Sequence, residues 1–182
     1  MLNDQAPILK GLRLSLRPAR EEDALWRQRL GYDPEIVRMF GGTVGSTMMS
    51  SEAAEHWAQT LIADRHNWII DLGEQGIGEI RLHHINAQDQ TASLAIGIFD
   101  RAQLGRGLGR EAISLVAQHG FDTLNLHRLG VRVLAFNARA IRCYRACGFR
   151  VEGRERQSCR IGDERHDDII MGLLAGELLQ PA

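Results

Sequence analysis

The stretch FDRAQLGRGLGREAISLV, residues 99–116, places three alternating glycines between an apolar segment and an apolar helical pattern. The glycines and the arginines beside them are Gly105, Arg106, Gly107, Gly109 and Arg110. The first N–H groups of a helix have no internal hydrogen-bond partners and carry the positive end of its dipole. Glycines at that point let the backbone turn sharply and let an anion come close, although they would also serve a simple tight turn. We therefore predict that the N–H groups of residues 105–110 hold a phosphate.

Two common nucleotide-binding motifs do not fit this segment. The dinucleotide fingerprint G-x-G-x-x-G would need glycine at position 110 or 112, where the chain has Arg110 and Ala112. The triphosphate loop G-x-x-x-x-G-K-[ST] fails too, because the glycines are not followed by Lys and then Ser or Thr. The pattern that remains is x-x-G-x-G, placed between a predicted strand and a predicted helix.

A second pattern lies downstream in NARAIRCYRACGF, residues 137–149. Its spaced residues are Asn137, Ala140, Tyr144, Gly148 and Phe149. Together with the glycine segment, it resembles the GNAT superfamily of N-acetyltransferases, in particular the branch with the ribosomal-protein N-terminal and polyamine acetyltransferases. The resemblance is detailed over residues 91–174. It departs from the family at Leu104, where Gln or Arg is usual, since Gln103 lies one residue early.

Hydrophobic periodicity predicts an α+β fold. We expect strands at about 12–18, 67–72, 77–85, 91–99 and 128–136, and two more within 149–174. We expect helices in two pieces broken near Asp33–Pro34, and at about 54–62, 108–123 and 137–148. The prediction is a mixed, mostly antiparallel central sheet of about six or seven strands with helices on both faces. A single domain would cover residues 1–182, and the resemblance makes it an acetyl-CoA-binding N-acetyltransferase fold.

Composition argues against several kinds of partner. The chain has 182 residues, of which 44% are hydrophobic and 25% charged, as in ordinary globular proteins. No apolar run approaches the roughly 20 residues of a membrane helix, and the start lacks a secretory signal pattern. The net charge of −1 gives no general affinity for nucleic acid. We expect a cytoplasmic protein without a bound metal, in which Cys143 and Cys147 are small buried side chains.

The two halves of the chain differ in charge. Residues 1–100 carry nine Lys and Arg against fourteen Asp and Glu, whereas residues 101–182 carry thirteen against nine. Two interpretations fit this difference: either the arginines are ordinary solvated surface residues, or a phosphate-bearing ligand docks on the C-terminal half. Arg106 and Arg110 are the arginines nearest the predicted phosphate.

The resemblance implies acetyl-CoA as the cosubstrate. Its pantetheine arm would lie between two splayed strands, those that end at Phe99 and Phe136, and N–H groups around Ile98 would orient the thioester carbonyl. The diphosphate would lie on the N–H groups of residues 105–110. Asn137 would contact the pantetheine or simply cap the following helix. The full set of expected cofactor contacts is Ile96, Ile98, Leu104, Gly105, Arg106, Gly107, Leu108, Gly109, Arg110, Asn137 and Ala140.

Acetyl transfer needs one group that protonates the departing thiolate and another that takes a proton from the amine. The resemblance gives Tyr144 the first role, although the apolar stripe around it also fits a core tyrosine. For the second role, many relatives carry Glu where this chain has Ser93, and serine is too weak a base. Glu79 is the candidate in the neighbouring strand, against a plain exposed carboxylate. At most one of His83 and His84 could line the site, because adjacent strand residues face opposite ways.

We therefore predict an acetyl-CoA-dependent N-acetyltransferase that moves the acetyl group directly to a primary amine. Candidate acceptors are a protein N-terminus, a polyamine, an amino acid or an aminoglycoside. The acidic residues of the N-terminal part would suit a cation; they are Glu21, Glu22, Asp23, Asp33 and Glu35. A relay through residues 166–168 is possible in principle, but charge pairing along an outer strand is preferred. The alternatives are a non-catalytic acetyl-CoA sensor and an unrelated phosphate-binding protein, and we expect a monomer or homodimer.

Overall fold

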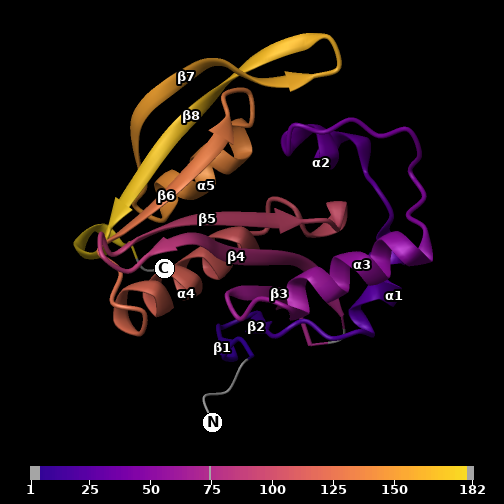
Figure 1. The fold of residues 1–182 in the computed structure, drawn as a ribbon, viewed down its shortest axis with the longest axis horizontal. Coiled ribbons are helices and arrows are strands. Elements are labelled where there is room, and N and C mark those ends of the chain that lie inside the picture. The colour runs from indigo at the N-terminus through magenta and orange to yellow at the C-terminus, as the bar shows by residue number, and fades with distance from the viewer. Residues whose placement is uncertain (1–4, 74, 180–182) are drawn as a thin grey trace.

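The computed structural model describes residues 5–73 and 75–179, so part of the predicted turn at 73–76 lies outside the described residues. Eight strands form one sheet in the order β1-β2-β3-β4-β5-β6-β8-β7 (Figure 1). The strands are β1 (Leu9–Lys10), β2 (Ser15–Arg17), β3 (Asn67–Asp71), β4 (Gly76–Asn86), β5 (Thr91–Ile98), β6 (Arg128–Leu134), β7 (Arg150–Ile161) and β8 (Glu164–Leu174). The helices are α1 (Asp23–Leu30), α2 (Pro34–Met39), α3 (Ser51–Ile62), α4 (Leu108–Asp122) and α5 (Ala138–Ala146), with short 3₁₀ turns at Arg101–Gln103 and Ala175–Glu177.

All neighbouring strands pair antiparallel except β5 and β6, which are parallel. The predicted α+β class with a mixed, mostly antiparallel sheet is confirmed. The strand count differs, because the strand predicted at 12–18 is a short hairpin. The N–H of Gly11 donates to the carbonyl of Leu14 at 2.9 Å, which turns the chain between β1 and β2. Leu12 consequently lies in the turn and is 91% exposed, while Leu14 and Leu16 are buried as expected.

Helices cover both faces of the sheet, as predicted (Figure 1). Successive side chains of β3 point to opposite faces of the sheet, so they pack alternately into the two cores. Trp68 and Ile70 belong to the main core with α4 and α5, whereas Ile69 packs with Trp26 of α1 and Leu61 of α3. The sheet therefore has a filled core on each side, and a ligand can reach its interior only where two strands separate.

Local signals set the helix boundaries. Ser50 caps α3 by accepting a hydrogen bond from the N–H of Ala53 at 3.1 Å. Asp33 caps α2 in the same way, with Pro34 at the first helical position. The break predicted at Asp33–Pro34 is thus the gap between α1 and α2. Within the described parts of the chain, no helix combines the length and apolar character needed to cross a bilayer.

Candidate functional site

The parallel strands β5 and β6 separate after a short paired region. Residues 91–93 pair with residues 128–130, and no pairing continues beyond them along the described strands. β5 runs on to Ile98 and β6 to Leu134, so the facing edges of both strands lack a strand partner there. The predicted splay between these two strands is therefore present, and it surrounds a cavity of about 540 Å³.

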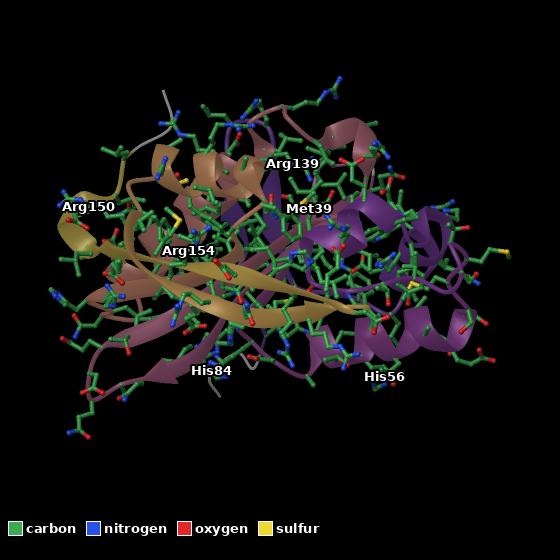
Figure 2. The ribbon with its side chains drawn as sticks, turned by 90° about the horizontal axis from the view of Figure 1, so that it is seen from above. Met39, His56, His84, Arg139, Arg150 and Arg154 are labelled. Carbon is green, nitrogen blue, oxygen red and sulfur yellow. The ribbon has the colours of Figure 1, made fainter. Side chains whose placement is uncertain are left out.

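The cavity is bounded by elements from both faces of the sheet. From the α4 and α5 side, the wall includes Gly109, Ile113, Ala140, Cys143 and Tyr144. From the opposite side, α2 and the β7–β8 hairpin contribute Ile36, Met39, Phe40, Ser158, Cys159 and Asp168. Met39 and Arg139, both labelled in Figure 2, line it from α2 and from the start of α5. Segments from distant parts of the chain thus enclose one cavity.

The three glycines at the start of α4 are not equivalent. Gly105 and Gly107 have φ values of 76° and 79°, a left-handed region that residues with a side chain rarely adopt. Gly107 is the residue that precedes the helix, and no side chain caps its first N–H groups. Gly109 has an ordinary backbone and lines the cavity. The first two glycines therefore make the turn, and the third keeps the cavity wall free of a side chain.

Arg13 stabilises this turn. The sequence did not indicate this role. Its Nη1 donates to the carbonyl of Arg106 at 2.7 Å, and its Nε forms an ion pair with Glu111 at 2.9 Å. Glu111 is buried in the first turn of α4 and also accepts the N–H of Arg13 at 2.8 Å. These contacts neutralise a carboxylate beside the predicted phosphate site. No local pattern could have indicated them, because the two residues are 98 positions apart.

The expected cofactor residues fall into two groups. Those that line the cavity are Ile96, Ile98, Leu104, Gly109, Asn137 and Ala140. The others, Gly105, Arg106, Gly107, Leu108 and Arg110, form the turn and the first helical residues around Gly109. The Asn137 side chain accepts the N–H of Ala140 at 3.1 Å, as a helix cap does, and donates to the carbonyl of Met39 at 3.4 Å. It therefore links α5 to α2 across the cleft.

Tyr144 belongs to the hydrophobic core and also lines the cavity. It is buried, and its ring lies 5.4 Å from that of Phe149. Burial, with a smaller contribution from Cys143 and Cys147, raises the pKa of the phenol, so it keeps its proton at neutral pH. Cys143 also lines the cavity; a hydrogen bond with Cys147 lowers the pKa of its thiol, and the charge of Arg110 adds to this effect.

Glu79 does not line the cavity. One of its carboxylate oxygens accepts Trp57 Nε1 at 2.5 Å, and the other pairs with Arg81 at 3.0 Å. It lies opposite Gly97 in the register of β4 and β5, close to the open part of the cleft. Ser93, by contrast, belongs to the closed, paired end of β5. The position where relatives were expected to carry Glu is therefore outside the cavity in this chain.

Four of the five acidic residues that were expected to suit a cation form ion pairs. Asp23 pairs with Arg17, Glu22 with Arg20, and both Asp33 and Glu35 with Arg101. On the far strand, His166, Asp167 and Asp168 lie near Glu164, Arg154 and Arg132. The pairing predicted for residues 166–168 is thus present, and in addition Asp168 reaches the cavity wall. The predicted surplus of negative charge for a cationic acceptor is thus reduced but not removed, because Arg101 is shared by Asp33 and Glu35 and Arg17 also pairs with Asp71.

The described chain combines a mixed sheet, two strands that separate after a short paired region, and a helix that begins at glycines beside the cavity between them. A family model described as the acetyltransferase (GNAT) domain matches residues 13–150. The chain therefore belongs to the GNAT acetyltransferase family, which uses acetyl-CoA and an amine acceptor. Across the described residues, no group of three or more His, Cys, Asp or Glu side chains is arranged to hold a metal ion.

Individual relatives agree with this assignment. The chain is 28% identical over 148 residues to the spermidine N(1)-acetyltransferase of Escherichia coli K12, covering 77% of this chain and 74% of that protein. It is 30% identical over 158 residues to the N-acetyltransferase YoaA of Bacillus subtilis, covering 83% and 87%. The structure of spermidine N-acetyltransferase from Vibrio cholerae in complex with CoA and spermine superposes with a TM-score of 0.75 at 24% identity, covering 91% and 97%. A GNAT acetyltransferase from Bacillus anthracis gives 0.81 at 19% identity, covering 94% and 100%, a likeness of fold.

Proposed function

We propose that acetyl-CoA lies in this cleft and that its acetyl group passes directly to a primary amine. In this proposal the diphosphate binds the N–H groups of residues 105–110, and the pantetheine arm runs between β5 and β6. The separation of these two strands is the observation that supports it, because free strand edges offer N–H and C=O groups to an extended amide-containing arm. Gly109 and Tyr144 border the same cavity, so the helix start and the phenol serve one ligand.

The proposed reaction has one tetrahedral intermediate. The amine nitrogen attacks the thioester carbon, and N–H groups around Ile98 stabilise the negative oxygen. The C–S bond then breaks, the sulfur leaves with the electron pair, and the amine proton is lost to a base. Tyr144 donates a hydrogen bond or its proton to the departing sulfur. Its raised pKa makes full transfer to a thiolate uphill, so stabilisation by hydrogen bonding contributes most.

Glu79 is the proposed acceptor of the amine proton, reached through water because the carboxylate lies outside the cavity wall. Its position opposite Gly97, beside Trp57, supports a place on the acceptor side of the sheet. The matching test is the pH dependence of kcat/KM in Glu79→Gln. Loss of the acid limb of that profile supports the role, and an unchanged profile contradicts it.

The proposal also covers the domain organisation, the oligomeric state, the cellular location and the acceptor. Residues 1–182 act as one N-acetyltransferase domain, as a monomer or homodimer in the cytoplasm. The free thiols of Cys143, Cys147 and Cys159 support a reducing compartment. Relatives that are spermidine acetyltransferases make a polyamine one candidate acceptor. A protein N-terminus remains another.

The experiment that tests the function is release of free coenzyme A thiol from acetyl-CoA with a panel of primary amines. We expect release above background for at least one amine, and a kcat about 10²-fold lower in Tyr144→Phe with a similar KM for acetyl-CoA. Cys143→Ser is the matched control from the neighbouring position; direct transfer predicts that it retains activity. Binding of coenzyme A without any release would instead indicate a sensor. Failure of coenzyme A to raise the melting temperature would refute the proposed site.

A further inference from the structure

Arg27 of α1 is a buried cation without a carboxylate partner. The buried charged side chains among the described residues are Asp23, Arg27, Glu111 and Asp168. Each of the three carboxylates forms an ion pair with an arginine. Arg27, which is 6% exposed, forms no ion pair with any described residue. Buried charges are normally paired or bound to a ligand, because removing them from water is costly.

The surroundings of Arg27 are aromatic. Its Nη1 donates to the carbonyl of Gly31 at 2.6 Å, and its Nε has no hydrogen-bond partner within the described chain. The guanidinium carbon lies 4.4 Å from the ring centre of Phe99, 5.3 Å from that of Tyr32 and 5.9 Å from that of Trp57. Ring faces attract a cation but carry no net charge, so they leave the positive charge of Arg27 uncompensated.

The nearest acidic groups are engaged elsewhere. The negative charge of Glu79 interacts electrostatically with Arg27, but its two carboxylate oxygens are bound to Trp57 and Arg81. Arg27 and Arg81 therefore share a single negative charge. Asp33 caps α2 through two N–H groups and pairs with Arg101. Arg27 thus has no carboxylate of its own among the described residues.

Arg27 borders a second hollow of about 170 Å³ that adjoins the cleft. Its other walls are mainly apolar or aromatic, namely Tyr32, Ile36, Val37, Phe40 and Phe99, and they include Asp33, whose carboxylate pairs with Arg101. Ile36 and Phe40 also line the larger cavity, so the two spaces lie on either side of these side chains. An acceptor that reaches past Ile36 and Phe40 would place one end near Arg27 and the other in the cleft.

We propose that Arg27 receives the carboxylate of the acceptor, which is then an amine that carries a carboxylate on an apolar body. This inference rests on the proposed function, since it concerns the second substrate of the same site. A guanidinium binds a carboxylate strongly, and an apolar wall excludes the water that would weaken the pair. A polyamine brings further positive charges next to an uncompensated cation and is disfavoured. The chain thus differs in acceptor class from the spermidine acetyltransferases that it resembles.

Acceptor preference is the first test. The kcat/KM values for 6-aminohexanoate, hexylamine and spermidine are compared in the wild type, Arg27→Met and Arg27→Lys, with Arg29→Met as control. Arg29 lies on the same helix but is exposed. We expect the wild type to prefer 6-aminohexanoate to hexylamine at least tenfold, Arg27→Met to lose this preference, and Arg27→Lys and Arg29→Met to keep part or all of it. Equal or better use of hexylamine or spermidine by the wild type overturns the inference.

Binding of an apolar carboxylate is the second test, and it does not depend on catalysis. Hexanoate, which has no amine, is titrated calorimetrically into the wild type and Arg27→Met, each saturated with coenzyme A. Binding to the wild type that weakens at least tenfold in Arg27→Met supports the carboxylate site, even if no amine in the panel is acetylated. Absence of binding, or equal binding to both proteins, contradicts it. Coenzyme A affinity measured on the same samples shows that the variant is folded.

Discussion

Alanine substitution at the three glycines of the phosphate loop separates backbone strain from contact with the ligand. At Gly105, φ is 76° and a Cβ would meet no other atom within 4 Å, so only the left-handed conformation opposes the change. That conformation costs about 1–2 kcal/mol for a residue with a side chain. At Gly109 the backbone is ordinary and the closest contact of a Cβ would be 3.5 Å, to Cys143. Alanine there gains up to about 1 kcal/mol of helix propensity.

Gly107→Ala should be the most damaging of the three. Its φ is 79°, and a Cβ would lie 3.3 Å from Arg13 Nη2, so the guanidinium, whose Nη1 donates to the Arg106 carbonyl, must move slightly. We expect a loss of unfolding free energy of about 2 kcal/mol relative to Gly109→Ala, measured by urea denaturation. The displaced amides should raise the KM for acetyl-CoA.

A truncated substrate identifies the part of the cofactor that the loop binds. S-acetylpantetheine has the thioester but lacks the diphosphate, so Gly107→Ala should change its KM little. The argument fails if Gly105→Ala and Gly109→Ala destabilise equally. It also fails if Gly107→Ala affects S-acetylpantetheine as much as acetyl-CoA, because the amides of residues 105–110 would then not bind the diphosphate.

Three further predictions concern buried charges. Burial alone would raise the pKa of Asp23, but hydrogen bonds from Arg17 and Trp26 lower it, so its stabilisation is complete above about pH 4 and is lost as the pH falls through the folded-state pKa. Asp23→Asn should abolish this acid-side loss in melting curves, and a parallel loss in the variant would contradict the assignment. Arg27→Met should raise the free energy of unfolding by about 1 kcal/mol, because it removes an uncompensated buried charge; a marked loss on urea denaturation would show that the ring contacts dominate. Glu111→Gln should cost about 1–3 kcal/mol and raise the KM for acetyl-CoA, since it weakens the ion pair that braces the glycine turn; unchanged kinetics would show that the brace does not serve the cofactor.

Local sequence signals predicted most of the elements. The break near Asp33–Pro34 and the helix start after the glycines were both predicted correctly. Such signals work because caps and turns depend on residues a few positions apart. The hairpin at residues 9–17 was not predicted, because its alternating leucines fit a single strand. The pairing of β1 with β2 and the hydrogen bond from Gly11 to Leu14 show where the chain turns.

The candidate site was predictable only in part. The glycine turn and the wall formed by Ala140 and Tyr144 follow from spaced motifs, and the structure brings them to one cavity. Glu79 was chosen for its neighbouring strand, but the orientation of its side chain depends on Trp57, which lies 22 positions away. The ion pairs between the N-terminal acidic residues and arginines could not be predicted either, because composition counts charges without their partners.

The sequence by itself determined the fold class, the positions of the helix starts and the family, because these depend on periodicity and on short motifs. Tertiary structure alone decided how far β5 and β6 pair before they separate, since the pairing joins segments that are far apart in the chain. It also decided that Arg13 meets Glu111 and that Arg27 is buried without an anion. The physical reason is that the energy of a charge depends on the groups around it in space, and these come from distant parts of the chain.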